Sequence, residues 1–530
     1  MITYDMRDLA DESLYEYLYR RIREDILSGR LKKGERMPSK RSFAKNQGVA
    51  VITVENAYAQ LVAEGYLYSE PRRGFFVSRI DESLRLPQVQ APVPGTGRKA
   101  LPGMDEKGRA ESGPAGKTEA AEANPAGKTE GAESDPAGKT EDAEVNPAGE
   151  KDRAAAVPAA ERAEIDLAQS RVSPDTFPFN TWAKLLREIL QTRRHELLEP
   201  APGAGIRPLR SAIAAYLLQY LNLRVSPDQI VIGAGTEYLY SLLIRLLGPE
   251  LVYAVELPGY PKTGRIYESN QVCVRYIPMD SSGICVDALR ESGADVAHIS
   301  PSHQFPTGIT MPIGRRSELL SWCRESGSHF LIEDDYDSEF RLSGRLIPPI
   351  MSIEDRGRVI YMNTFTKSLA STIRISYMVL PPALLQRYRE KLGFYSCTVP
   401  SFEQYVLAEF IGRGYYEKHI NRMRNYYRQK RNRLLHAISG SGLRDLTSVS
   451  GAEAGLHFLL LVKSGRTEDE LTALAAAKGV RVYGLSRYMN REEKELRERW
   501  PGPCMVVNFQ GLSNEAVDAL PELLEEAWFS

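Results

Sequence analysis

The chain has 530 residues, more than one hydrophobic core usually supports, so two or more domains are expected. Hydrophobic residues make up 42% of the chain and charged residues 26%, as in ordinary globular proteins. The five scattered cysteines form no CxxC pair, the N-terminus lacks a signal-like apolar stretch, and no apolar run could span a bilayer. These features exclude a disulfide-rich secreted protein and a membrane protein, and they predict a cytoplasmic one.

The net charge of −1 gives no sign of a nucleic-acid partner, but the charges are unevenly distributed. Residues 1–80 carry 14 Lys and Arg against 11 Asp and Glu, whereas residues 111–150 carry 3 Lys against 10 acidic residues. A basic head followed by an acidic segment is therefore expected.

The head, residues 1–80, is predicted to contain three helices and two strands. Leu14, Leu18, Ile22 and Ile26 form one apolar stripe, which predicts a helix over residues 13–28. Ser39 is a natural N-cap for a short helix over residues 40–47. After a turn at Gly48, a further helix is predicted to end before Gly65, and short strands are expected at residues 66–69 and 75–77.

This order of elements predicts a winged helix-turn-helix. A helix fits the major groove and reads base edges, while a basic hairpin tip contacts phosphates or the minor groove. Lys40 and Arg41 are placed where the first helix of the pair would cross the DNA backbone, and Arg72 and Arg73 are placed at the tip of the wing. The alternative is a small helical dimerisation module with solvated charges.

The segment from SLYEYLYRR to EPRRGFFV resembles the GntR-type winged helix over nearly its whole length. Members of that family commonly carry a polar Ser-Arg-x-Thr at the start of the recognition helix, where this chain has Ala50-Val51-Ile52-Thr53. Of these four positions, Thr53 keeps a polar side chain for the groove.

Residues 81–164 are expected to form a disordered linker. A Pro-Ala-Gly-Lys-Thr-Glu motif begins at residues 114, 125 and 136, and a decayed copy begins at residue 147. The repeat contains no large apolar side chain, so it has no face to bury against a neighbouring repeat.

Residues 165–530 read as an α/β domain. A short apolar strand at residues 230–233 runs through Gly235 and Thr236 into a helix, which suits an anion at the helix N-terminus. Two further strands, residues 329–334 and 358–365, end in Asp334-Asp335-Tyr336 and in Thr364-Phe-Thr366-Lys367. Strands that alternate with helices predict a parallel sheet whose site lies at the carboxyl edge of the strands.

A carboxylate, a phenol, hydroxyls and a lysine would then meet in one crevice. Pyridoxal 5'-phosphate requires this set: a lysine for the Schiff base, a carboxylate for the pyridine nitrogen, a phenol for the ring oxygen, and hydroxyls with an arginine for the phosphate. Each residue alone has a simpler explanation as a surface charge, a solvated loop or core. The Asp-Asp-Tyr-Asp run could also suggest a metal site, but no metal is expected.

The body resembles a fold-type-I aminotransferase, and the fusion of head and body resembles the MocR subfamily of GntR regulators. The matching segments are VIGAGTEYL, VELPGYP, SPSHQFPTGITMP, IEDDYDSEF, NTFTKSLASTIRISYMVLP and NFQGL. The resemblance covers everything except the linker.

The resemblance implies a role for each matching residue. Lys367 would form the internal aldimine, Asp334 rather than Asp335 would pair with the pyridine nitrogen, and Tyr336 would bond the ring 3-oxygen. Tyr260 would stack on the ring, and His303 or Gln304 would approach it. The phosphate would be held by Gly235, Thr236, Thr364, Thr366 and Arg374.

Two departures from the aminotransferase pattern bear on activity. Phe305 stands where aminotransferases often have an asparagine, and Val506, Val507 and Asn508 stand near the position of the usual carboxylate-binding arginine. Arg481 and Lys262 are the substitutes that the sequence offers for an effector carboxylate, although either could be a plain surface charge.

The sequence thus predicts three segments: residues 1–80 that bind DNA, a linker over residues 81–164, and an effector domain over residues 165–530. The favoured function is a homodimeric regulator that senses pyridoxal phosphate or an amine through Lys367. The alternative is an active aminotransferase with an accessory DNA-binding head. Because the carboxylate arginine is missing, we expect partial transamination at most.

Overall fold

The computed structural model describes residues 4, 13–70, 73–78, 165–168, 172–173, 176–343, 346–489 and 502–530. The linker that the sequence predicts over residues 81–164 therefore lies outside the described residues. Within the described part of the chain, no helix is long and apolar enough to cross a membrane.

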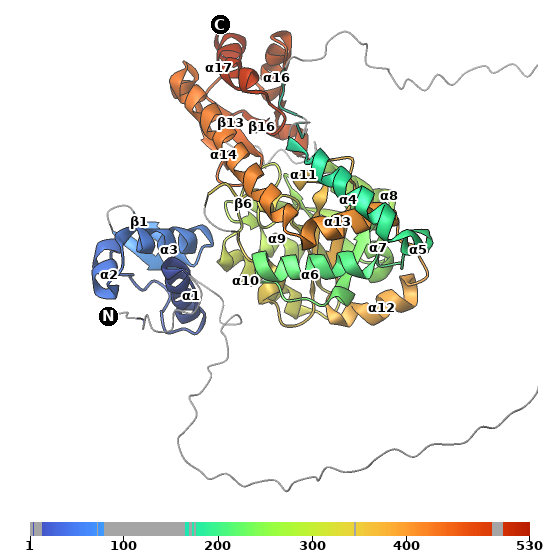
Figure 1. Ribbon diagram of the computed structural model, residues 1–530. Coiled ribbons are helices and arrows are strands. Elements are labelled where there is room, and N and C mark those ends of the chain that lie inside the picture. Colours follow the sequence, from blue (N-terminus) through green and yellow to red (C-terminus); the bar gives the residue numbers. More distant parts are fainter. Residues whose placement is uncertain are drawn as a thin grey trace, which may run out of the picture. The chain divides into compact units, whose positions relative to one another are not determined.

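The N-terminal residues form the predicted winged helix (Figure 1). Its elements are α1 (Leu14–Leu27), α2 (Lys40–Gln47), α3 (Val51–Ala63), β1 (Leu67–Glu70) and β2 (Gly74–Val77). The Ser39 hydroxyl caps α2 by accepting from the Ser42 amide, and Gly48 ends α2 at a φ of 68°. Tyr17, Leu18, Ile22, Val54 and Tyr58 are fully buried. Leu14 is 40% exposed, so the predicted stripe is one residue too long at its start.

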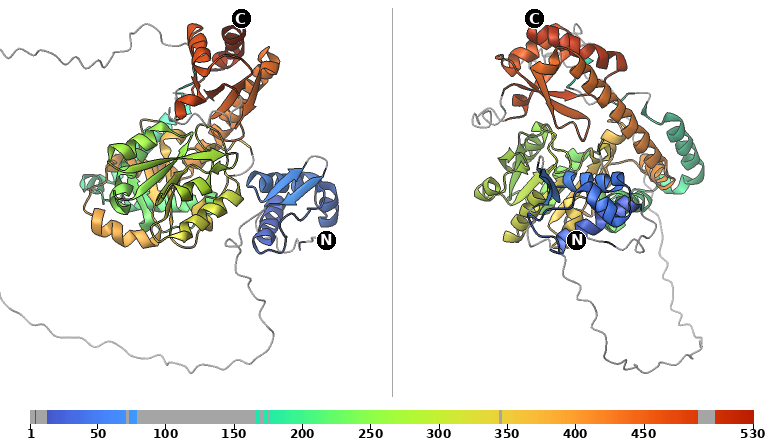
Figure 2. Two further views of the ribbon diagram at one scale, coloured as in Figure 1. Left: turned by 180° about the vertical axis from the view of Figure 1, so that it is seen from behind. Right: turned by 90° about the vertical axis from the view of Figure 1, so that its left-hand side faces the viewer.

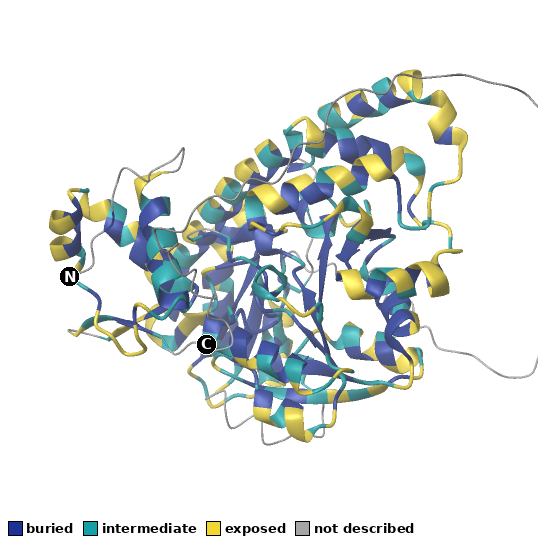
Figure 3. Ribbon diagram, turned by 90° about the horizontal axis from the view of Figure 1, so that it is seen from below, coloured by how far each residue is buried: buried dark blue, intermediate teal, exposed yellow. Residues whose placement is uncertain are grey.

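The body contains an eight-stranded sheet whose central strands are buried (Figure 3). In sheet order the strands are β4 (Ile230–Gly233), β11 (Ser376–Val379), β10 (Val359–Thr364), β9 (Phe330–Asp334), β8 (Val296–Ile299), β5 (Val252–Leu257), β6 (Cys273–Asp280) and β7 (Gly283–Ile284). The five strands from β10 to β6 are parallel, while β11 and β7 run antiparallel to their neighbours. The sheet is thus mixed, which corrects the expected parallel sheet.

Helices cover both faces of this sheet (Figure 2). These are α6 (Arg207–Leu221), α7 (Thr236–Leu247), α8 (Pro261–Ser269), α9 (Val286–Glu291), α10 (Ile313–Glu325), α11 (Phe365–Ser368), α12 (Pro382–Leu392) and α13 (Ser401–Gly412). The helices α4 (Phe179–Thr192) and α5 (Arg194–Leu198) precede them, and α13 packs on α4 and α6. Short 3-10 turns lie at Pro227–Gln229, Ser338–Phe340, Ile350–Ile353 and Leu485–Tyr488.

A second, smaller sheet lies near the C-terminus, reached by the long helix α14 (Tyr415–Gly440) (Figure 1). Its antiparallel strands are β12 (Thr447–Ser450), β13 (His457–Val462), β16 (Cys504–Asn508) and β15 (Tyr483–Gly484). The accompanying elements are α15 (Leu443–Leu446), α16 (Glu468–Ala477), α17 (Asn514–Phe529) and the pair β3 (Ile165–Asp166) and β14 (Val480–Arg481).

Candidate functional site

The candidate site lies at the carboxyl edge of the large sheet, as the sequence predicts. The strands β9 and β10 are parallel neighbours, with Asp334 opposite Met362. The chain then continues from β10 through Thr364 into α11, which carries Lys367. The register therefore brings the Asp-Asp-Tyr-Asp run and the lysine to the same edge.

Asp334 is buried and held by two side chains that the sequence analysis missed. Its Oδ2 atom accepts from the Tyr240 hydroxyl at 2.5 Å and lies 3.5 Å from Nε2 of His298. Its Oδ1 atom is buried and has no hydrogen-bond partner among the described residues. Such an orphaned carboxylate oxygen suits an N–H donor on a ligand. Tyr240 and His298 lie in an apolar helix and an apolar strand, where no motif marked them.

Asp335 points to a different group of side chains. Its Oδ2 atom accepts from the Tyr361 hydroxyl at 2.8 Å. Burial raises the pKa of Asp335, and hydrogen bonds from Ser338 and Tyr361 oppose that shift. Successive side chains of a strand point to opposite faces, so Asp334 and Asp335 serve different surroundings.

Lys367 is partly buried near the carboxylate of Asp337. Burial lowers the pKa of Lys367, and the charge of Asp337 acts in the opposite direction. Desolvation favours the neutral amine, which is the nucleophilic form of a lysine. Burial therefore shifts Lys367 toward the form of a lysine that reacts with a carbonyl.

Tyr336 and His303 adjoin one another. The Tyr336 hydroxyl donates to the His303 carbonyl oxygen at 2.9 Å, and burial raises its pKa. Nδ1 of His303 lies 2.9 Å from Oδ2 of Asp337. Gln304, the alternative to His303, donates instead to the Pro258 carbonyl at 2.9 Å.

The turn between β4 and α7 forms a cradle suited to an anion. Gly235 has a φ of 90°, and a Cβ there would lie 2.5 Å from Nη2 of Arg374. The Gly235 amide donates to the Gly233 carbonyl, so the amides at the start of α7, beginning with Thr236, remain the better donors for a phosphate. The Thr364 and Thr366 hydroxyls lie 2.8 Å apart at the end of β10.

The two cations that the sequence offers for an effector carboxylate, Lys262 and Arg481, are each paired with an acidic side chain. Lys262 forms an ion pair with Glu237, and Arg374 lies 3.6 Å from the same carboxylate. Arg481, on β14, lies 3.3 Å from Oδ2 of Asp166. Lys262 and Arg481 thus each already have a carboxylate partner within the chain. Tyr260, the expected stacking residue, is 55% exposed and packs edge-on against Phe305 at 5.8 Å.

The surface of the winged helix that would face DNA combines basic, ion-paired and apolar side chains. Arg41 is exposed, while Nζ of Lys40 lies 2.5 Å from Glu55 on α3. Val51 and Ile52 are 43% and 60% exposed at the start of α3, whereas Thr53 is partly buried. Asn56, which the sequence analysis did not single out, is exposed one turn later. Arg73 pairs with Glu70 on the wing, and Arg72 lies outside the described residues.

Comparison with known proteins finds family matches in two parts of the chain. Residues 14–77 match the family of bacterial regulatory proteins called gntR, and residues 163–487 match aminotransferase class I and II. The HTH-type transcriptional regulator YdeL of Bacillus subtilis is 33% identical over 99% of each chain. The probable rhizopine catabolism regulatory protein MocR of Rhizobium meliloti is 28% identical over 90% of this chain and 87% of its own.

The chain belongs to the MocR-type family of GntR transcriptional regulators. Its body has the aminotransferase fold: a multiple substrate aminotransferase from Thermococcus profundus superposes with a TM-score of 0.59 and 27% identity, covering 69% of this chain and 93% of that one. Pyridoxal phosphate is the cofactor of this fold. The orphaned Oδ1 of Asp334, the cradle at Gly235 and Lys367, whose pKa is lowered by burial, fit that cofactor.

Proposed function

We propose that the protein is a homodimeric, cytoplasmic regulator that binds DNA through its winged helix and responds to pyridoxal phosphate, or to an amine, at Lys367. Residues 1–80 would serve as the DNA-binding head, residues 81–164 as the linker and residues 165–530 as the effector domain. The observation that carries the cofactor part is the placement of Lys367 and the half-satisfied carboxylate of Asp334 at one sheet edge.

Bound pyridoxal phosphate would supply an electrophilic carbonyl for amines and an electron-withdrawing ring. Lys367 would hold it covalently, and Asp334, fixed by Tyr240, would hold a proton at the pyridine nitrogen. Tyr336 would contact the ring oxygen, and Tyr260 and His303 would flank the ring. The α7 amides would hold the phosphate with Thr364, Thr366 and Arg374.

The DNA part rests on the exposed face of the head. Arg41, Lys40, Arg73 and Arg72 would contact phosphates, and α3 would enter the major groove with Thr53 among the groove-side residues. Exposed apolar side chains at the start of α3 suit contact with thymine methyl groups. A dimer would match two half-sites on DNA.

Ligand-dependent DNA binding tests this function directly. Full-length protein would be used to select its preferred duplex from a random pool, and the dissociation constant would then be measured with and without pyridoxal phosphate, and with a panel of primary amines. We expect the ligand to change the affinity by about 5-fold or more. Lys367→Ala should remove that change, and Lys463→Ala, an exposed lysine in the C-terminal part, should keep it.

Two results would count against the proposal. If the DNA affinity stayed unchanged in every condition, ligand binding at Lys367 would not influence the DNA-binding head. Sustained transamination of an amino acid at about 1 per second or faster would favour the enzyme instead.

A further inference from the structure

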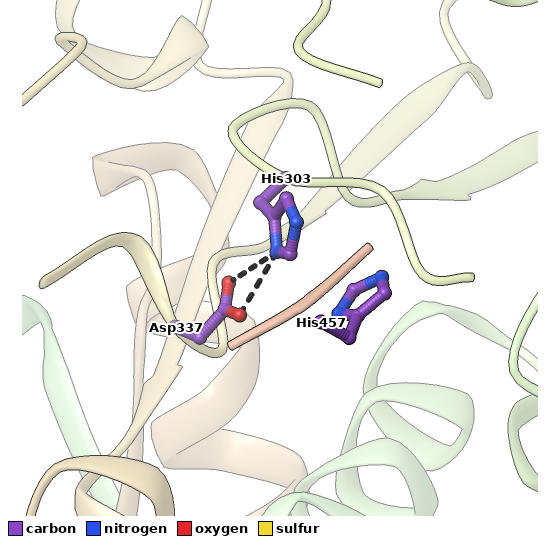
Figure 4. A group of neighbouring side chains, drawn as sticks. All are labelled: His303, Asp337 and His457. Atoms are coloured by element: carbon purple, nitrogen blue, oxygen red, sulfur yellow. Dashed lines mark hydrogen bonds and ion pairs between the residues drawn. The ribbon is translucent and has the colours of Figure 1, made fainter. Parts of the chain in front are cut away.

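Three side chains from distant parts of the sequence form a buried cluster (Figure 4). His303 follows β8, Asp337 follows β9, and His457 is the first residue of β13 in the smaller sheet. Each offers a nitrogen or carboxylate oxygen, and these atoms lie within 4.8 Å of one another. His303 is 2% exposed and both Asp337 and His457 are 3% exposed.

Both imidazoles leave a nitrogen without a partner. The Nε2 atoms of His303 and His457 are buried and have no hydrogen-bond partner among the described residues. Buried polar atoms in native proteins nearly always have partners, so two orphaned imidazole nitrogens in one cluster point to a missing ligand. Asp337 lies against the other nitrogen of His303, with its Oδ2 atom 2.9 Å from Nδ1, and of the three residues only His303 is also an expected cofactor contact.

The chain passes close to the His303 ring at Gly455. A Cβ on Gly455 would lie 1.9 Å from Cε1 of His303, so only glycine lets the chain pass the ring on its way to His457. The His303 and His457 ring centroids are 4.4 Å apart. A small cavity lined by Ser302, Ala454 and Gly455 also borders His303 and Asp337.

We propose that His303, Asp337 and His457 form a binding site for a divalent transition-metal ion of the zinc class. Two imidazoles and one carboxylate are a ligand set that zinc accepts, with the fourth position left to water or another ligand. Ligand atoms about 2.0–2.2 Å from a tetrahedral zinc lie about 3.3–3.5 Å apart, so side-chain shifts of about 1.5 Å or less would complete the site. The ion would connect the two sheets of the body.

This site goes beyond the proposed function, although it shares His303 with the expected cofactor contacts. It also gives a role to the last aspartate of the Asp-Asp-Tyr-Asp run, which the cofactor does not use. The sequence alone predicts no metal, because the three ligands are more than 30 residues apart along the chain and show no metal-like spacing.

The test measures metal directly on the full-length protein. After incubation with Zn²⁺ and dialysis against metal-free buffer, elemental analysis should find about one equivalent per chain. His457→Gln and Asp337→Asn should each lose it, while their circular dichroism and DNA binding stay unchanged. His436→Gln, at an exposed histidine of α14, and Cys273→Ser, at an exposed cysteine, should retain it.

Co²⁺ provides a second readout of the same site. The visible bands of protein-bound Co²⁺ should appear in the parent and in His436→Gln but not in His457→Gln. Retention of the same amount of Zn²⁺ by His457→Gln and the parent, or retention of none by the parent, would overturn the proposal. Loss of Zn²⁺ in Cys273→Ser alone would likewise assign the metal to the surface.

Discussion

The Tyr240 hydroxyl donates to Oδ2 of Asp334 at 2.5 Å, which ties the end of β9 to the second turn of α7. Both residues are buried, and the other carboxylate oxygen of Asp334 has no partner among the described residues. The tyrosine thus fixes one oxygen and leaves the other available to a ligand.

Tyr240→Phe should weaken cofactor binding without preventing folding. The variant removes a hydrogen bond to a charged group, which is worth about 1.5–3 kcal/mol. We therefore expect at least a roughly 10-fold higher dissociation constant for pyridoxal phosphate in a fluorescence or absorption titration. Tyr253→Phe, a buried tyrosine on β5 whose hydroxyl bonds only the Gly248 carbonyl among the described contacts, is the matched control.

Substitutions of Asp334 and of its neighbour Asp335 should have different effects on the affinity for pyridoxal phosphate. Asp334→Asn keeps the shape of the side chain but no longer favours a protonated pyridine nitrogen, so the affinity for pyridoxal phosphate should fall about 10-fold or more. Asp335→Asn should leave that affinity within about 2-fold, because Asp335 bonds Tyr361 on the other face. The reverse order of effects would assign the pyridine contact to Asp335.

Gly235→Ala should damage the phosphate cradle. The position has a φ of 90°, and the new methyl would lie 2.5 Å from Nη2 of Arg374. The left-handed backbone alone costs about 1–2 kcal/mol, and Arg374 would have to move. Pyridoxal phosphate should bind more weakly, while pyridoxal, which lacks the phosphate, should be little affected. Gly465→Ala, which meets no atom within 4 Å, is the control.

Much of this site could be predicted from the sequence because its residues follow short, strongly apolar strands. The strands ending at Asp334 and Thr364 were expected within a residue or two of where they lie, and their parallel pairing brings Lys367 and Asp334 to one edge. The helices of the head could be located because Ser39, Gly48 and Gly65 mark helix starts and ends by their local chemistry.

Long-range pairing accounts for what the sequence did not reveal. β11 looks like any other apolar strand, so its antiparallel insertion between β4 and β10 carried no local signal. His457 lies 120 residues or more from Asp337 and His303, and only the packing of the smaller sheet joins them. The carboxylate partners of Lys262 and Arg481 were hidden for the same reason.

His419 should make the body less stable in mild acid. Its Nε2 atom lies 2.7 Å from the Ser368 carbonyl, and burial lowers its pKa to about 4. The unfolded chain, with a histidine pKa of about 6.5, therefore binds more protons, and this stability is present above pH 6.5 and is lost as the pH falls toward 4. Between pH 7.5 and 5 the loss should be about 2 kcal/mol.

Urea unfolding at these two pH values checks this expectation. In His419→Gln the difference in unfolding free energy between pH 7.5 and 5 should shrink by about 2 kcal/mol, since glutamine does not titrate. An unchanged pH dependence would show that His419 is already protonated, or solvated, in the folded protein.

Arg41→Ala should reduce DNA affinity for all sequences alike. Arg41 is exposed on α2, and a phosphate contact adds about one unit to the slope of log affinity against log salt. Footprinting from low to moderate salt should show that slope fall by about 0.9 with an unchanged sequence preference. A relaxed preference at one base pair would assign Arg41 to base readout instead.

The most direct test of the central claim is the visible absorption spectrum of the full-length protein after addition of pyridoxal phosphate and removal of the excess. The parent should keep the band of lysine-bound cofactor, Lys367→Ala should lose it or show only free aldehyde, and Lys463→Ala should match the parent. A parent without any cofactor band, or a Lys367→Ala variant with the parent's band, would contradict the assignment of Lys367 as the cofactor lysine.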